Sequence, residues 1–436
     1  MIHKSFATEE IIAAIDLGSS HCITLIASVN PDGTLKIIGD GTVPTRGVQH
    51  GTIIALSEAT DTIEQSLTKA ERFCGKNINS VYLNVSGHHI LSQNDKGEIA
   101  IESPEENITD SDIERAIEFA RTTALPANRE ILNLVVRYFK IDDQPQNIPD
   151  PLGMTGTKLE ANVHLITANT SILRNFEKAL GNIGLGKEAF VFSGYAASEV
   201  VLSAAEKEAG VICIDIGSDI TNYCVYLEGA LTLSGVIPIG GRYVSQDIGQ
   251  YLKVSLETAE KIKIGLANLP PITPRQPEES PKDFRQRQKE ADLLRVGDFE
   301  PGQTATASKN FLVNTVIHAR LKEILDMIDN DLRTHKLANK LAAGAVLVGG
   351  GAKTVNVAPI AERVLRMRAR VGVPQAMDGV VKNTTDPSYA TAVGLLNFAA
   401  KERSVEITET AKNSDKTNGL DNWFSKWGHK IKNFMP

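Results

Sequence analysis

Asp16-Leu17-Gly18-Ser19-Ser20 follows an apolar run, and Asp215-Ile216-Gly217-Ser218-Asp219 repeats the pattern later in the chain. Each stretch is predicted to be a tight turn that joins two strands of a hairpin. Glycine lets the backbone approach a ligand closely, and serine hydroxyls and backbone N–H groups can face phosphate oxygens. The aspartates that open the turns are suited to hold magnesium through water. Taken singly, either turn is more often an ordinary hairpin.

Gly349-Gly350-Gly351-Ala352-Lys353 is a third glycine-bearing segment, placed between the apolar run 341–348 and a helix predicted for 357–368. Bare backbone lets a flat base or a ribose lie against it, and core packing alone does not explain three consecutive glycines. Two phosphate turns followed by such a loop are the arrangement of the actin-like nucleotide-binding fold, shared by actin, large heat-shock chaperones and sugar kinases. The sequence therefore predicts a two-lobed α/β chain that binds a nucleotide.

Glu260 and Lys263 lie one turn apart on the same face of a helix predicted for 256–266. Alone, they would be interpreted as an ordinary solvated ion pair. Beside the three loops, we expect them to contact the adenine edge and the ribose.

Composition and charge narrow the class of protein. The chain has 436 residues, a formal charge of -7, 42% hydrophobic and 23% charged residues, which excludes collagen, low-complexity disorder and a disulfide-stapled miniprotein. The mild acidity argues against a general nucleic-acid binder. No run reaches the roughly 18 to 20 apolar residues of a membrane span, and the start lacks a signal-peptide pattern, so a cytoplasmic location is expected. The four cysteines show no CxxC pairing, so neither zinc nor structural disulfides are expected.

The order of predicted elements divides the chain into two lobes. The first-lobe core is expected at 1–85, with 168–197 and 386–400, and the second-lobe core at 198–248, with 340–385. A change of texture indicates an inserted small α/β subdomain at 86–167, and 249–339 is expected to form an outer subdomain of the second lobe. Within the outer subdomain, 270–309 is dense in Pro, Glu, Gln and Arg and is predicted to be a long mobile loop without a core.

The C-terminal segment 420–436 is predicted to be an amphipathic helix, joined to the lobes by a disordered polar linker at 401–419. Its apolar residues fall within about 100° of arc at about 100° per residue, and its cations lie on the remaining face. A helix of about 22 Å is too short to span a bilayer but can lie flat among anionic headgroups. Docking of this helix on the protein's own core or on a partner is the alternative. The residues expected to contact the membrane are Leu420, Trp423, Phe424, Trp427, Lys430, Ile431 and Phe434.

Several further stretches resemble one family, the actin-like bacterial cell-division protein FtsA, over nearly the whole chain. They are Ser86-Gly87-His88-His89-Ile90, Val163-His164-Leu165-Ile166-Thr167, Ala196-Ala197-Ser198, Ile237-Pro238-Ile239-Gly240-Gly241 and Thr391-Ala392-Val393-Gly394-Leu395-Leu396. The resemblance implies an actin-like, two-lobed ATP-binding fold in which the usual small subdomain is missing and another is inserted elsewhere, which matches 86–167.

The resemblance also implies a set of site residues. It assigns ATP phosphates to Asp16, Gly18, Ser19, Ser20, Asp215, Gly217, Ser218 and Asp219, and adenosine to Gly349, Gly350, Gly351, Lys353, Glu260 and Lys263. Magnesium would be held indirectly by Asp16 and Asp215. No catalytic residue is assigned, because Asp219 stands where actin-like proteins commonly have glycine, and it either contacts magnesium or faces away. We therefore expect ATP binding with weak or absent hydrolysis.

For function, the resemblance implies a self-assembling scaffold that tethers filaments of the tubulin-like protein FtsZ to the cytoplasmic face of the inner membrane at the division septum. Arg320, on a helix predicted for 311–336, matches a family arginine implicated in binding the C-terminal peptide of FtsZ, although a solvated arginine remains equally open. Later division proteins are expected to contact the inserted subdomain. The alternatives are an actin-like adaptor of type IV pilus assembly and a small-molecule kinase of the same superfamily.

Overall fold

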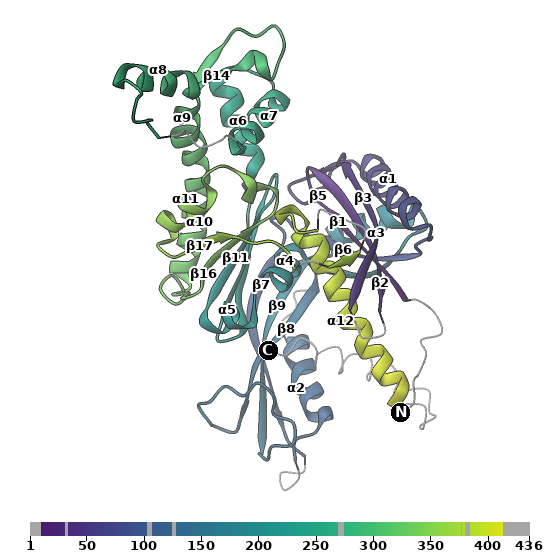
Figure 1. Ribbon diagram of the computed structural model, residues 1–436. Helices are drawn as coiled ribbons and strands as arrows, with labels where there is room; N and C mark the ends of the chain where they lie inside the picture. The colour runs from purple at the N-terminus through teal and green to yellow at the C-terminus, as the bar shows by residue number, and fades with distance from the viewer. Residues whose placement is uncertain are drawn as a thin grey trace.

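The protein is described by a computed structural model over residues 10–30, 34–102, 107–123, 128–268, 274–375, 377–379 and 384–412. Within these ranges the fold is built on two mixed sheets, one in each lobe (Figure 1). The first sheet has the order β10-β6-β1-β2-β3-β18, and the second has the order β13-β12-β11-β16-β17. Their strands are β1 (Glu10–Leu17), β2 (His21–Val29), β3 (Leu35–Pro44), β6 (Ser80–Val85), β10 (Gly186–Phe192), β18 (Asp378–Gly379), β11 (Val211–Ile216), β12 (Thr221–Leu227), β13 (Ala230–Ile237), β16 (Gly344–Val348) and β17 (Ala369–Val371).

The two sheets repeat one construction. In the first, β1, β2 and β3 form an antiparallel meander, while β6 runs parallel to β1 and β10 runs parallel to β6. In the second, β11, β12 and β13 form the meander, while β16 and β17 add in parallel. The predicted hairpins at 11–29 and 211–226 therefore occupy equivalent places in the two lobes.

The side chains of the central strands of the second sheet alternate between two hydrophobic cores, one on each face of the sheet. Ile212, Ile214 and Leu347 pack into a core under the second-lobe helices, whereas Cys213 and Val346 point to the opposite face and join the first-lobe core. Because side chains alternate between the faces of a strand, these mainly apolar runs bury both faces. The helices around the two cores are α1 (Leu56–Cys74), α3 (Thr170–Gly181), α4 (Ser193–Val201), α5 (Ala204–Ala209), α6 (Gly241–Leu252), α7 (Leu256–Ala267), α9 (Lys309–Phe311), α10 (His318–Thr334), α11 (Val357–Leu365) and α12 (Ala390–Lys412).

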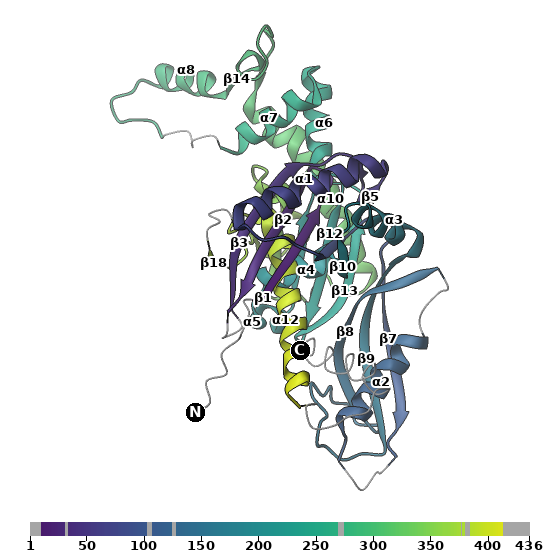
Figure 2. The same ribbon diagram turned by 90° about the vertical axis from the view of Figure 1, so that its right-hand side faces the viewer.

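The segment after β6 forms a separate layer with its own core. The strands β7 (Leu91–Ala100), β9 (Lys158–Asn169) and β8 (Arg129–Ile141) pair in that order, and α2 (Asp110–Thr123) covers them. Most of their buried apolar side chains form a cluster distinct from the two lobe cores, while Val135, Ile166 and Ala168 join the first-lobe core. Figures 1 and 2 show this layer at one end of the molecule and the outer part of the second lobe at the other.

The prediction that 270–309 is a long mobile loop is wrong, because most of the described part of this segment is structured. Ser280 accepts a hydrogen bond from the backbone N–H of Asp283 at 3.1 Å and caps α8 (Pro281–Asp292). The strand β14 (Leu293–Arg295) then pairs with β15 (Thr306–Ser308), which buries Leu294 in the second-lobe core. A polar segment can therefore hold a fixed hairpin when a few apolar side chains are anchored. The remaining short strands, β4 (Val48–Gln49) and β5 (Thr52–Ile53), pair with each other in the first lobe.

The end of α12 also differs from expectation, since this helix continues to Lys412 through the first part of the expected linker. Arg403 stabilises the continuation through ion pairs with Glu10 at 3.2 Å and Glu188 at 3.3 Å. The rest of the linker and the predicted amphipathic helix lie outside the described residues. Among the residues that are described, no helix has the length and apolar character needed to cross a membrane.

His164 links the inserted layer to the second lobe, and its burial makes the molecule sensitive to acid. The Nδ1 atom lies 2.7 Å from Asn94 Oδ1, and Nε2 lies 2.8 Å from Ser234 Oγ in β13. Burial, with the charge of Arg137 adding, lowers the pKa of His164 from 6.5 to about 3. The unfolded chain therefore binds a proton near pH 6.5 that the native chain resists, so stability is lost as pH falls below that value.

Between pH 7 and pH 5, we expect the free energy of unfolding of the wild-type chain to fall by about 2 kcal/mol more than that of His164→Gln. The reason is that each pKa unit corresponds to about 1.4 kcal/mol. Urea unfolding of both proteins at the two pH values measures the difference. His89, whose pKa burial also lowers, is present in both proteins and cancels in the comparison. Equal losses in the two proteins would show that His164 does not titrate as its burial requires.

Candidate functional site

The first turn is held by an asparagine that the sequence analysis missed. Gly18 N–H donates to His21 O at 3.1 Å and closes the β1–β2 hairpin. The amide of Asn84, from β6, donates to Asp16 Oδ1 at 2.7 Å, and its oxygen accepts from the N–H of Leu17 at 2.6 Å. This side chain therefore fixes both the aspartate and the backbone that enters the turn.

The second turn has the same construction. Gly217 N–H donates to Ile220 O at 2.9 Å, and Asn222 Nδ2 donates to Asp215 Oδ2 at 2.9 Å. Ser86, which follows β6 directly, donates a hydrogen bond to Asn222 Oδ1 and so connects the second turn to the first lobe. Both asparagines occur in strands whose other residues are mainly apolar, and that polar interruption was the available sequence signal.

Asp215 lies close enough to Asp16 for its charge to affect the pKa of Asp16. Burial raises the pKa of Asp16 to about 8, with the charge of Asp215 adding, and burial raises the pKa of Asp215 against the opposing hydrogen bond from Asn222. Two neighbouring carboxylates that are largely shielded from water are costly to ionise unless a cation is shared between them. A magnesium ion with its water ligands fits this oxygen donor set.

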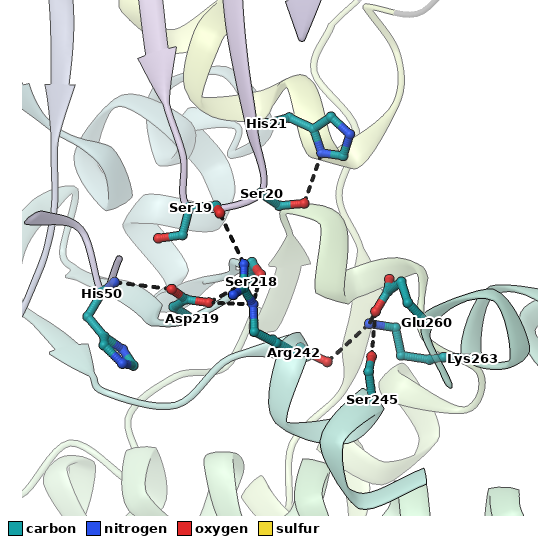
Figure 3. Close-up of polar contacts among 11 residues, drawn as sticks. Ser19, Ser20, His21, His50, Ser218, Asp219, Arg242, Ser245, Glu260 and Lys263 are labelled. Atoms are coloured by element: carbon teal, nitrogen blue, oxygen red, sulfur yellow. Dashed lines mark hydrogen bonds and ion pairs between the residues drawn. The ribbon is translucent and has the colours of Figure 1, made fainter. Parts of the chain in front are cut away.

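The side chain of Asp219 lies between Arg242 and the backbone of His50, as Figure 3 shows. Its side chain is 2% exposed, and its Oδ1 lies 2.9 Å from Nε of Arg242. The other oxygen, Oδ2, accepts the backbone N–H of His50 from the first lobe at 3.1 Å. Arg242 Nη2 in turn donates to Ser19 O at 3.1 Å. Arg242 and His50 were not predicted from the sequence, because nothing in their local pattern indicates contacts across the lobes.

Packing explains two of the three consecutive glycines in the loop but not Gly350. Gly349 has a φ of +81°, and a Cβ there would lie 2.4 Å from Asp215 Oδ1. A Cβ on Gly351 would lie 2.2 Å from the side chain of Ile216, whereas Gly350 has open space. The loop therefore lies directly against the second turn, and Lys353 at its end pairs with Asp386 at 3.1 Å.

Glu260 and Lys263 form the predicted same-face pair on α7, with Nζ and Oε2 2.7 Å apart. Lys263 also donates to Gly241 O at 3.0 Å, and Ser245 donates to Glu260, so the pair is fixed against α6. The pKa of His21 is lowered by burial and by the charge of Lys353, with Glu260 opposing the shift. The glycine loop and α7 are therefore both near the first turn.

The structure thus brings the two turns, the glycine loop and the Glu260–Lys263 pair of α7 close together, whereas Arg320 lies apart from them. The guanidinium of Arg320, on α10, makes two hydrogen bonds of 2.8 Å to Asp247 of α6 and one of 2.5 Å to Glu323. Its side chain is 23% exposed. Serine hydroxyls, paired aspartates and cations around a glycine loop suit a nucleotide with a divalent cation.

A duplicated sheet with an aspartate-bearing turn in each half defines an actin-like protein. The solved PilM–PilN complex of type IV pilus biogenesis has the same fold, with a TM-score of 0.61, 15% identity and coverage of 89% of this chain and 98% of that one. MreB5 of Spiroplasma citri bound to AMPPNP has a TM-score of 0.51 and 13% identity over 93% of this chain and 98% of that one.

The chain belongs to the FtsA family of cell-division proteins. The family model described as cell division protein FtsA matches residues 212–394, and the model of the SHS2 domain inserted in FtsA matches residues 87–167. FtsA of Borreliella burgdorferi is 31% identical, with 96% of this chain and 99% of the relative covered. FtsA of Escherichia coli K12 is 32% identical, with 96% and 98% covered.

Proposed function

We propose that this protein binds ATP with magnesium between its lobes, self-assembles, and tethers FtsZ filaments to the cytoplasmic face of the inner membrane at the septum. The observation that carries the nucleotide part is the convergence of both turns, the Gly349–Lys353 loop and the Glu260–Lys263 pair on one site. The solved structure of MreB5 of Spiroplasma citri is bound to AMPPNP, in keeping with a nucleotide site in this fold. Membership of the FtsA family favours division over the pilus and kinase alternatives.

We propose a role for each group of the site from its position. The serine hydroxyls and backbone of the two turns bind the phosphates, Lys353 and the Glu260–Lys263 pair flank the adenosine, and Asp16 and Asp215 hold the water ligands of magnesium. The ion supplies charge neutralisation of the phosphates when it is bound. Asp219 is engaged by Arg242 and His50, so it is not free to activate a water molecule, which supports binding with slow or absent hydrolysis.

For the FtsZ contact, we propose that an acidic peptide of FtsZ exchanges with Asp247 or Glu323 on the guanidinium of Arg320. Tyr251 lies one turn after Asp247 on α6, and its ring stacks on Phe311 at 5.0 Å between centroids. The two residues are 49% and 41% exposed, respectively, so an apolar surface adjoins the cation. A peptide with both carboxylates and apolar side chains suits such a surface.

Flotation with anionic lipid vesicles tests the tether. With ATP present, FtsZ should float with the full chain and stay at the bottom with a truncation that ends at Asn418. Trp423→Glu should release the protein from the vesicles, because a charge replaces a large apolar side chain on the membrane face, while its melting temperature stays unchanged.

Arg320→Glu serves as the matched variant for the other end of the tether. It should float as wild type does but leave FtsZ at the bottom, which separates membrane binding from FtsZ binding. If the full chain itself stays off the vesicles, or if Trp423→Glu loses its fold, the tail packs on the protein and the membrane part of the proposal is wrong.

A further inference from the structure

We infer that Arg242 binds the terminal phosphate of the nucleotide, and that Asp219 positions its guanidinium; the inference rests on the proposed nucleotide function. The backbone of Arg242 is fixed to the second turn, since its N–H donates to Ser218 O at 2.8 Å. Its side chain then reaches the first turn, where Nη2 donates to Ser19 O at 3.1 Å. One residue therefore contacts both turns that are proposed to hold phosphates.

The order of side chains across the site assigns Arg242 to one end of the phosphate chain. Lys263 and Glu260 lie at the side proposed for adenosine, and Lys263 donates to the carbonyl of Gly241, next to Arg242. From there the arginine side chain extends toward Asp219 and His50, away from the Glu260–Lys263 pair (Figure 3). A nucleotide with its adenosine at α7 would place its last phosphate toward the guanidinium.

The charges and donors of the site support this assignment. Three carboxylates, those of Asp16, Asp215 and Asp219, lie at the ends of the two turns, so a bound polyphosphate needs nearby cations. Lys353 and Lys263 are each engaged by a carboxylate on the adenosine side. Arg242 uses Nε for Asp219 Oδ1 at 2.9 Å and for Ser218 Oγ at 3.3 Å. Its Nη1 has no hydrogen-bond partner within the part of the chain that the structure describes, and a guanidinium can bind two phosphate oxygens at once.

Asp219 is suited to positioning rather than to direct contact with the ligand. Its carboxylate is almost completely buried and lies between the guanidinium of Arg242 and the backbone N–H of His50. An aspartate held from both lobes fixes one edge of the guanidinium and offsets its own charge. This arrangement accounts for an acidic residue beside phosphates, where actin-like turns commonly carry glycine.

The test is the ratio of affinities for Mg·ATP and Mg·ADP, measured by isothermal titration calorimetry on the full chain. Arg242→Gln should weaken Mg·ATP binding at least tenfold and change Mg·ADP binding by less than threefold, and Arg242→Lys should fall between Arg242→Gln and wild type. Arg174→Ala, an exposed change on α3, should leave both affinities unchanged. The melting temperature of each variant shows that it is folded.

Asp219→Asn tests the positioning role, because it keeps the volume and removes the charge. A positioning residue predicts a partial loss of the ATP preference, whereas tighter Mg·ATP binding would show that Asp219 merely repels phosphate and would overturn this part. If wild type binds ATP and Arg242→Gln keeps the same ATP-to-ADP ratio, the inference is overturned and the proposed function stands. If wild type binds neither nucleotide, the proposed function itself is wrong.

Discussion

Replacing Gly394 by alanine is expected to destabilise the protein by about 3 kcal/mol or more, although alanine is the better helix former. A Cβ at Gly394, on α12, would lie 1.9 Å from the carbonyl oxygen of Ala196 on α4. The overlap is with backbone, which cannot swing aside, so α12 would have to move off α4 and open the first-lobe core around Leu395. Overpacking typically costs about 1–3 kcal/mol and occasionally more, against a gain of about 1 kcal/mol from helix propensity.

Gly181→Ala is the matched control for this prediction. Gly181 ends α3, has no unusual backbone angle, and would have nothing within 4 Å of an added Cβ. The same substitution there should be neutral or should stabilise by up to about 1 kcal/mol. Thermal denaturation measures both variants. The midpoint should fall for Gly394→Ala and should stay the same or rise for Gly181→Ala. An unchanged midpoint for Gly394→Ala would mean that the two helices separate at little cost.

The fold and the centre of the site could be predicted because their signals are local. A glycine turn after an apolar run fixes a hairpin, and two such turns with a glycine loop specify the lobes. The groups that complete the site could not be predicted in this way. Asn84 contacts Asp16 from another strand, and Arg242 meets Ser19 across the lobes. Contacts between residues far apart in sequence are set by the packed sheets rather than by any pattern beside either residue.

Local composition was misleading where tertiary anchors decide the structure. The polar segment 270–309 forms α8 and a hairpin because Ser280 caps the helix and Leu294 is buried. The Ser-Pro-x-Asp pattern at 280–283 was a helix-start signal that the composition obscured. Ion pairs of Arg403 likewise continue α12 into residues that would be expected to be a linker. Average composition describes the cost of ordering a segment, and a few buried or paired groups can offset that cost.

The double substitution of Asp16 and Asp215 by asparagine should weaken magnesium-dependent ATP binding by 100-fold or more, equivalent to about 2.7 kcal/mol. The two carboxylates are the oxygen pair proposed to hold the cation, and asparagine cannot ionise but keeps an acceptor for Asn84 and Asn222. Calorimetric titration of ATP with magnesium and with EDTA measures the effect. In EDTA the variant should bind ATP as well as wild type or better, because no carboxylate at these two positions can repel the phosphates.

Weaker ATP binding in magnesium together with unchanged or tighter binding in EDTA would distinguish loss of a cation site from loss of the fold. Because burial raises the pKa of Asp16 to about 8, its ionised form costs folding free energy, so the double variant should melt at the wild-type temperature or above it. Asp61→Asn, on the exposed side of α1, is the control and should change neither binding nor melting. Equal weakening in magnesium and in EDTA would instead place the two aspartates against the nucleotide itself. Full retention of magnesium-dependent binding would move the cation to other residues and leave the raised pKa of Asp16 as a cost of packing alone.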